Sequence, residues 1–314
     1  MLKSFSKYKK ALLIGIGGGA DIIVTIPTKL HLESFGIKCI LGGLPWERYS
    51  IDPFPGPRPF DQIVNVTNIN DSFCWANEKT QTEDGLLFSE SKVSKVLKEK
   101  ILLVNIFNSS SKIAKDLKEF CKKNKIDLIV GVDVGGDVMA KGDEPGLSSP
   151  LADSIMLSAL KKVETSVDTK IAVLGYGSDG ELEPSELNNS LSIISKKKGL
   201  IGMLGINADS QRIMKKLIAK IETDASRIPT LAFSGTYGLS KIRRGRIEID
   251  IHPFSQITVY IKTNVIFKDI SLSAKLIHNS SNIWESNNIL LKNGFKTELD
   301  FEIKKHLTSL EDIR

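Results

Sequence analysis

The chain has 314 residues, of which 41% are hydrophobic and 25% are charged, and its formal net charge is +6. These values are ordinary for a globular protein, and the length allows one large α/β domain or two smaller ones. Lysines and arginines are spread along the chain, and the two dense basic runs, 196–198 and 241–246, are interpreted as solvated surface, so no nucleic-acid partner is expected.

Short apolar runs alternate with amphipathic stretches from residue 11 to about residue 225. The apolar runs predict strands at 11–16, 37–41, 62–66, 101–106, 127–132, 170–174 and 200–204. The stretches between them predict helices at 20–35, 91–98, 111–124, 151–162, 185–197 and 210–223. Apolar strands without alternation are typically buried on both faces. The pattern therefore predicts a three-layer α/β fold with a mostly parallel, doubly wound sheet and glycine-rich loops at the carboxyl ends of its strands.

The remainder of the chain follows a different pattern. It predicts two antiparallel strands joined near His252, then two helices, at 245–250, 256–261, 267–278 and 284–293. We interpret this part, about 226–314, as an α+β appendage of a core formed by about 11–225. Residues 1–314 are thus expected to form a single α/β domain.

The cysteines and the N-terminus bear on the compartment. Cys39, Cys74 and Cys121 lie far apart without a CxxC pair, which indicates free thiols in a reducing environment. The apolar run at 11–16 is interrupted by glycines at once, and no apolar stretch approaches ~20 residues. We therefore expect a cytoplasmic protein with no targeting segment and no membrane contact.

The first candidate ligand loop follows the strand at 11–16. It holds three consecutive glycines, Gly17, Gly18 and Gly19. Such glycines let backbone amides approach an anion at a helix N-terminus, as in a dinucleotide-binding fingerprint. Against NAD, Asp21 brings a negative charge close to the phosphate position, and the second strand ends in Leu41-Gly42-Gly43 without an acid. Close packing without a ligand, or a different ligand, remain as alternatives.

The second candidate loop, 131–146, is the most informative. Asp133 and Asp137 lie at the carboxyl end of a strand, where open α/β sheets bind ligands. The same loop carries further candidate ligand-binding residues, Gly135, Gly136, Lys141 and Glu144. Clustered carboxylates repel one another unless a cation, a basic group or a hydroxyl-rich ligand lies among them. The loop therefore predicts Mg²⁺ held by Asp133 and Asp137, or a sugar diol, with a solvated acidic turn as the alternative.

Other segments supply further candidates. A third loop after a strand adds Gly177, Ser178, Asp179 and Glu181. Asp153 lies in the first turn of the helix that Ser149 is expected to cap, so either helix capping or a functional role explains it. Arg48 follows the second strand and would hold a phosphate or carboxylate, or else form a surface ion pair. The sequence contains no Walker A, HExxH or GxSxG motif.

These loops also carry a resemblance that extends over nearly the full chain. The matching stretches are GIGGGADI at 15–22, LGGLPWER at 41–48, DPFPGPRP at 52–59, GVDVGGDVMAKGDEPGLSSPLAD at 131–153, SDGEL at 178–182 and TELDFE at 297–302. In these motifs the chain resembles the archaeal and bacterial family called domain of unknown function eleven-fifty-two. It departs from the usual GGGGD by carrying Ala20. The resemblance implies one full-length α/β protein and supplies no catalytic residues.

Taken together, the loops predict a small-molecule-binding protein. The leading hypothesis is an Mg²⁺-dependent enzyme that acts on a phosphorylated or ribosyl-type metabolite, with Asp133, Asp137 and Asp179 as catalytic residues. A ligand-binding or regulatory protein without turnover is the alternative, followed by a nucleotide-cofactor oxidoreductase and a metal-free isomerase or lyase. We expect a small-molecule ligand as the partner, and a homo-oligomer is compatible with the sequence.

Overall fold

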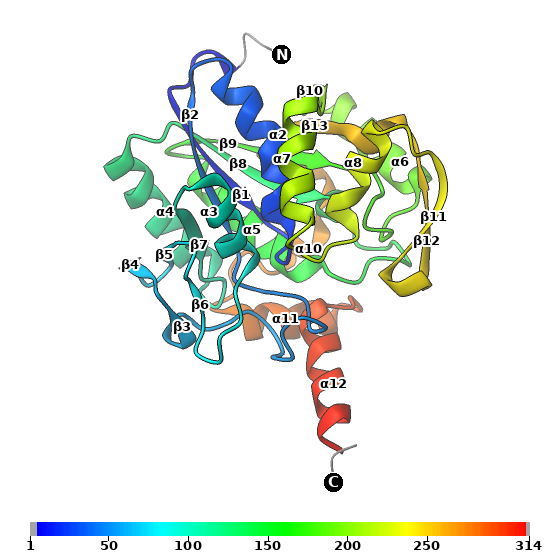
Figure 1. Ribbon diagram of the computed structural model, residues 1–314. Helices are drawn as coiled ribbons and strands as arrows, with labels where there is room; N and C mark the ends of the chain where they lie inside the picture. Colours follow the sequence, from blue (N-terminus) through cyan, green and yellow to red (C-terminus); the bar gives the residue numbers. More distant parts are fainter. Residues whose placement is uncertain (1–4, 312–314) are drawn as a thin grey trace.

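The computed structural model describes residues 5–311, and within them the chain is built around a nine-stranded sheet (Figure 1). The strand order is β10-β13-β9-β8-β1-β2-β7-β5-β4. In chain order the strands are β1 (Lys10–Gly15), β2 (Lys38–Gly43), β4 (Thr67–Asn70), β5 (Phe73–Ala76), β7 (Ile101–Val104), β8 (Leu128–Val134), β9 (Asp168–Leu174), β10 (Leu200–Gly205) and β13 (Ile257–Lys262).

The central strands run parallel, as the apolar runs predict. β9, β8, β1, β2 and β7 pair in parallel, whereas β13 pairs antiparallel with both β9 and β10, and β5 and β4 add an antiparallel edge. All seven residues of β8 are buried. A strand in this position is covered on both faces, which explains its continuous apolar sequence.

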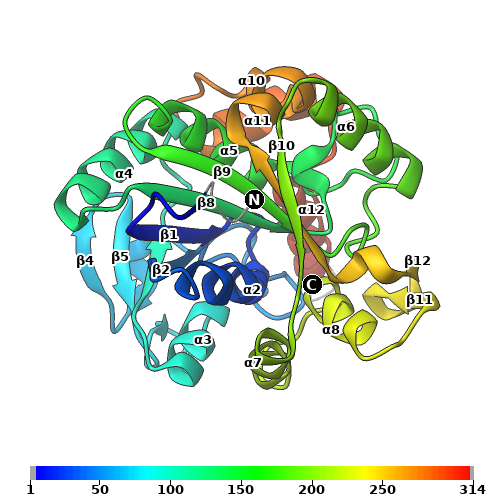
Figure 2. The same ribbon diagram turned by 90° about the horizontal axis from the view of Figure 1, so that it is seen from above.

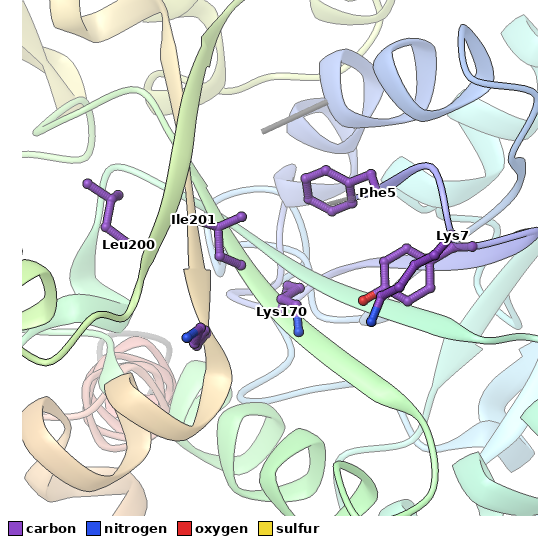
Figure 3. Close-up of a pocket in the computed structure, with 7 residues that line it drawn as sticks. Phe5, Lys7, Lys170, Leu200 and Ile201 are labelled. Carbon is purple, nitrogen blue, oxygen red and sulfur yellow. The ribbon is translucent and has the colours of Figure 1, made fainter. Parts of the chain in front are cut away.

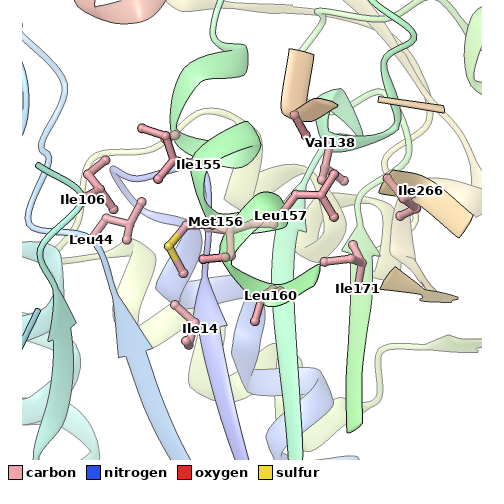
Figure 4. Close-up of a cluster of buried hydrophobic side chains, with 14 of the residues drawn as sticks. Ile14, Leu44, Ile106, Val138, Ile155, Met156, Leu157, Leu160, Ile171 and Ile266 are labelled. Atoms are coloured by element: carbon pink, nitrogen blue, oxygen red, sulfur yellow. The ribbon is translucent and has the colours of Figure 1, made fainter. Parts of the chain in front are cut away.

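Helices cover both faces of the sheet and complete the three layers (Figure 2). One face carries α2 (Asp21–Glu33), α3 (Ser89–Leu97) and α7 (Ala208–Ile218). The other carries α4 (Ser110–Asn124), α5 (Pro150–Val163), α6 (Pro184–Lys196), α10 (Leu272–Leu276) and α11 (Ile283–Lys292). Strand β1 supplies both layers, because Leu12 and Ile14 enter one apolar cluster and Ala11 and Leu13 the other. Figure 4 shows Ile14 below Met156 and Leu160 of α5.

Helix α4 illustrates how the sequence sets these elements. Ile113, Leu117 and Cys121 recur at helical spacing and are buried against the sheet. The Ser109 side chain accepts a hydrogen bond from the Lys112 amide and caps the first turn. At the other end Lys125 adopts a left-handed conformation (φ +55°) that stops the helix.

The C-terminal part differs from its sequence-based prediction in its strand pairing. The two strands expected to join near His252 do not pair with each other. Instead β12 (Ile247–Ile251) forms a separate hairpin with β11 (Gly238–Ile242), and β13 enters the main sheet between β9 and β10. The apolar sequence of β13 explains this, because four of its six residues are buried. The expected helix at 267–278 is divided into a π-helical turn, Ile266–Ile270, and α10.

Two short strands and three further α-helices are also present. They are β3 (Ile63–Val64), β6 (Gln81–Thr82), α8 (Ile228–Phe233), α9 (Thr263–Val265) and α12 (Glu298–Glu311). The strand predicted at 62–66 is reduced to β3. The neighbouring pair β4 and β5 was not predicted, because each strand has only four residues and β4 is largely polar. Within residues 5–311, no helix is both long and apolar enough to cross a membrane.

Candidate functional site

The sheet has a switch point between β1 and β8. After β1 the chain turns into α2 on one face, and after β8 it leads to α5 on the other face. Loops that part in opposite directions leave a crevice at the carboxyl ends of the strands, which is where open α/β sheets bind ligands. The glycine-rich loops after β1, β8 and β9, together with the segment after β2, converge there.

Ten residues line a small cavity at this crevice. Eight of them are sequence-predicted site residues: Gly17, Asp21, Arg48, Asp133, Asp137, Asp153, Asp179 and Glu181. Val134 and Ser149 complete the lining. The cavity measures only about 10 Å³, which is enough for roughly one water-sized species. Six carboxyl groups and two side chains of other polar types therefore surround a space that fits an ion.

Three of the carboxylates form a compact group. Asp133 ends β8, Asp137 lies in the loop that follows, and Asp153 lies on the first turn of α5. One oxygen from each lies within 4.8 Å of the others, and all three residues are at least nine-tenths buried. Mg²⁺ and Ca²⁺ bind oxygens at about 2.0–2.6 Å, so ligands on opposite sides of the ion lie about 4–5 Å apart. The group is therefore spaced to hold a divalent cation.

Several of these oxygens lack partners among residues 5–311. Both carboxylate oxygens of Asp153, and Oδ2 of Asp133 and of Asp179, are buried without a hydrogen-bond partner. Buried polar groups in native proteins are nearly always hydrogen-bonded, and isolated buried charges are costly. A cation at this position would supply the positive charge that these carboxylates lack.

Burial also changes the acidity of the cluster. Burial, opposed by hydrogen bonds from Asp137 and from the Val138 amide, raises the pKa of Asp133 to about 6. Burial and the neighbouring Glu181 raise the pKa of Asp179 to about 8. The pKa of Asp153 lies well above its ordinary value, through burial and the charge of Asp133. In the absence of a cation these carboxyl groups therefore resist ionisation.

Asp21 lies close to the position that a phosphate would take in a dinucleotide-binding loop. Its Oδ2 accepts a hydrogen bond from the Gly17 amide at 2.9 Å. A Cβ atom on Gly17 would lie 2.7 Å from this oxygen and 3.1 Å from Oδ2 of Asp153, so only glycine fits between the two carboxylates. The Gly19 amide donates to the Trp46 carbonyl. Two amides of the glycine-rich loop are therefore engaged within the protein.

Glu181 differs from the aspartates because both its carboxylate oxygens have hydrogen-bond partners. It accepts hydrogen bonds from the amides of Ser148 and Ser149, from the Ser149 hydroxyl, and from Arg243 at 2.8 Å. Burial alone would raise its pKa, but the ion pair with Arg243 and the hydrogen bonds from Ser149 and Ser148 together outweigh burial, and the pKa of Glu181 is lowered. Glu181 is thus a charged wall of the cavity.

Arg243 was missed by the sequence analysis, which interpreted 241–246 as solvated surface. It lies at the turn of the β11–β12 hairpin, and three quarters of its side chain is buried against Glu181. The hairpin packs over the third loop, where a Cβ on Gly180 would lie 2.5 Å from Ile247. A basic run of this kind looks like surface because the contact that buries one member is distant in sequence.

Glu298 was also missed as a site residue. It lies at the start of α12, and its carboxylate accepts hydrogen bonds from the amides of Leu151 and Ala152 at the N-terminus of α5. Ser149 was expected to cap α5, but its hydroxyl bonds to Glu181 instead. Burial raises the pKa of Glu298 to about 7, against the lowering effect of these amides. Only the TELDFE resemblance drew attention to this segment.

The other predicted residues do not line the cavity. They are Gly18, Gly19, Gly135, Gly136, Lys141, Glu144, Gly177 and Ser178. Several of them shape the loops: a Cβ on Gly135 would overlap the Asp179 carboxyl group, and the Gly177 amide donates to the Gly135 carbonyl. Glu144 accepts the amides of Lys141 and Gly142, each at 2.7 Å, and so fixes its own turn.

Comparison with known proteins identifies a family whose function is unknown. Among proteins with a curated description, none matches this chain. A family model described as "Protein of unknown function (DUF1152)" matches residues 12–306. This range contains every residue that lines the cavity, as well as Arg243 and Glu298. The chain belongs to the DUF1152 family.

Proposed function

We propose that this protein is a divalent-cation-dependent enzyme that acts on a phosphorylated small molecule. One observation carries the proposal: Asp133, Asp137 and Asp153 are buried and closely spaced where the end of β8 and the loop after it meet the first turn of α5. Buried carboxylates held this close together raise the energy of the fold unless a cation or protons neutralise them. Mg²⁺ is the first candidate because it favours carboxylate oxygens and pairs with phosphate substrates.

Two arginines support a phosphate-bearing substrate. Arg48 lines the cavity, is exposed, and forms no ion pair within the described chain, and Arg243 forms an ion pair with Glu181, which lines the cavity. A cation together with guanidinium groups stabilises the negative charge that develops when a phosphoryl group is transferred. Arg48 and the cation would hold the phosphate, and release of Arg243 from Glu181 would add a second clamp.

Asp179 is the candidate for proton transfer. Its Oδ2 is buried without a partner among the described residues, and its pKa is raised to about 8. A group that titrates close to neutral pH is suited to general acid–base catalysis. In this role Asp179 would protonate a leaving oxygen or accept a proton from an attacking hydroxyl.

The test starts with metal binding. Purified protein is stripped with a chelator and titrated with MgCl₂ and MnCl₂ by calorimetry and thermal melting. At a hundred times its Kd a bound cation stabilises the fold by about 2.7 kcal/mol. We expect this gain in the wild type and in the control Asp143→Asn, which alters an exposed acid of the same loop, but not in Asp133→Asn. Equal gains in Asp133→Asn and the control would contradict the metal site.

Catalysis is then tested on a panel of sugar phosphates and nucleotides, with phosphate release and product formation followed by NMR. We expect turnover that needs the cation and falls by at least about a hundredfold in Asp133→Asn.

A second candidate, a cation-responsive binding protein without turnover, is favoured by the cavity volume. A space of about 10 Å³ accepts an ion but not a metabolite unless the β11–β12 hairpin moves. Metal binding that depends on Asp133, combined with no turnover on any phosphorylated compound, would support this candidate over the enzyme.

A further inference from the structure

A second pocket lies at the opposite edge of the sheet from the carboxylate cavity. It has a volume of about 330 Å³ and opens where β9 and β10 begin and β13 ends (Figure 3). Three lysines line it, Lys7, Lys170 and Lys262. β9 therefore connects two sites of opposite charge, with Lys170 near its start and the carboxylate loops beyond its end.

The lysines repel one another when no ligand is bound. Lys170 of β9 and Lys262 of β13 are direct cross-strand partners in the antiparallel pair. Like charges placed directly opposite each other destabilise a sheet. Burial lowers the pKa of Lys170. The charges of Asp168 and Glu164 oppose this effect, whereas those of Lys7 and Lys262 add to it.

One carboxylate lies among the three ammonium groups. Asp168 pairs with Lys7 at 2.8 Å, accepts a hydrogen bond from the Tyr8 hydroxyl, and lies 3.8 Å from Lys170. Lys262 forms no ion pair within residues 5–311. The pocket therefore has positive charge in excess, centred on the Lys170–Lys262 pair.

The rest of the pocket is apolar. Phe5 is almost fully buried at its wall, and Leu200 and Ile201 of β10 are partly exposed on it. Figure 3 shows Lys170 between Ile201 and Lys7, with Phe5 above. Apolar surface beside an excess of ammonium groups suits a ligand with an anionic head and an apolar body.

We propose that this pocket binds a small organic phosphate monoester, with its dianionic phosphate between Lys170 and Lys262 and its apolar body against Phe5, Leu200 and Ile201. The inference is independent of the proposed function. A dianion suits the site because two like charges face each other, and a phosphate monoester carries nearly two charges at neutral pH.

Phenyl phosphate is the probe, titrated into the full chain by calorimetry in the presence of a chelator, so that the carboxylate cavity holds no cation and repels phosphate. Lys262→Met tests the pocket, and Lys216→Met, which alters an exposed lysine of α7, is the control. We expect binding by the wild type and the control, and affinity at least about tenfold weaker in Lys262→Met, because the phosphate loses one of its two charge-assisted contacts.

A stability measurement separates a lost ligand contact from damage to the fold. Without ligand, Lys262→Met should melt at or above the wild-type temperature, because the like-charge pair is removed. Absence of phenyl phosphate binding at millimolar concentration, or equal binding by Lys262→Met and the control, would overturn the proposal. Equal affinity for inorganic phosphate and phenyl phosphate would contradict the role of the apolar wall.

Discussion

The glutamates and the aspartates around the cavity differ in their hydrogen-bond partners. Glu181 and Glu298 each accept backbone amides, and Glu181 also pairs with Arg243. Asp133 and Asp153 carry oxygens that have no partner in the described chain. Glu181 is as fully buried as the two aspartates, and Glu298 is half-buried. Burial therefore does not distinguish Glu181 from the aspartates, whereas the hydrogen-bond partners do.

The difference separates carboxylates that build the site from carboxylates that are available to a ligand. A carboxylate with several donors contributes to stability, and its removal leaves those donors unsatisfied. A buried carboxylate without donors costs stability until a cation or proton arrives. Such a cost is tolerated at functional sites and compensated by the surrounding structure. Substitutions in the two groups should thus have opposite signs.

The largest effect is expected for Glu181→Ala. The change leaves Arg243 and the amides of Ser148 and Ser149 without their carboxylate. Breaking a buried ion pair from one side costs about 3–5 kcal/mol, which urea unfolding measures directly. The exposed Glu78→Ala serves as the control and should change little. A loss no larger than that of the control would remove the distinction between the two groups.

Asp153→Asn should have the opposite sign in a chelating buffer. Neither oxygen of Asp153 has a partner within residues 5–311, and its neighbours are carboxylates that an amide can donate to. Because the raised pKa of Asp153 obliges the folded protein to take up a proton at neutral pH, its replacement should stabilise the fold by about 1–3 kcal/mol, measured against Asp143→Asn. With Mg²⁺ added, the wild type should become more stable than Asp153→Asn, since only the wild type is stabilised by the cation. A destabilised variant in the chelating buffer would show that Asp153 belongs with Glu181.

The smallest effect concerns Glu90, a buried carboxyl group outside the cavity. Glu90 is almost fully buried beside Gly43, and burial and the charge of Glu47 raise its pKa well above the ordinary value, with Asp21 adding to the shift and Lys92 opposing it. A raised carboxyl pKa means that its favourable contribution is present at low pH and is lost as the pH rises through the folded-state pKa.

Glu90→Gln should therefore melt above the wild type at pH 8, by roughly 1 kcal/mol in stability, with the gap closing toward pH 4. Melting temperatures across this range, with the exposed Glu119→Gln as control, provide the measurement. Added Mg²⁺ should not alter the gap, which distinguishes Glu90 from the aspartates of the cavity. A gap that is constant with pH would contradict the raised pKa.

The sequence was sufficient to predict the parallel centre of the sheet, and its three glycine-rich loops suggested a shared crevice. Strands such as β8 are apolar throughout, which is the pattern of a strand covered on both faces. Parallel strands bring their carboxyl ends to one edge, so Asp21, Asp133 and Asp179 were expected near one another once the strands were parallel. Eight of the predicted residues line the cavity for this reason.

The features that the sequence did not predict depend on contacts between segments that are distant in sequence. Arg243 lies in a basic run with no periodicity, and Glu298 lies in the first turn of a helix, where an acid is ordinary. The position of β13 between β9 and β10 is likewise absent from any local pattern, because periodicity gives the existence of a strand but not its neighbours.

The place of β13 has a consequence for how the chain is made. Residues 257–262 fill the gap between β9 and β10, so during synthesis from the N-terminus both strands exist before the strand that joins them. Until then each presents an open edge, which is a template for association with other chains. The N-terminus of α5 receives the Glu298 carboxylate later still. Nascent chains are therefore exposed to aggregation until β13 has emerged and paired, and insertion of β13 is the long-range step expected to set the folding rate.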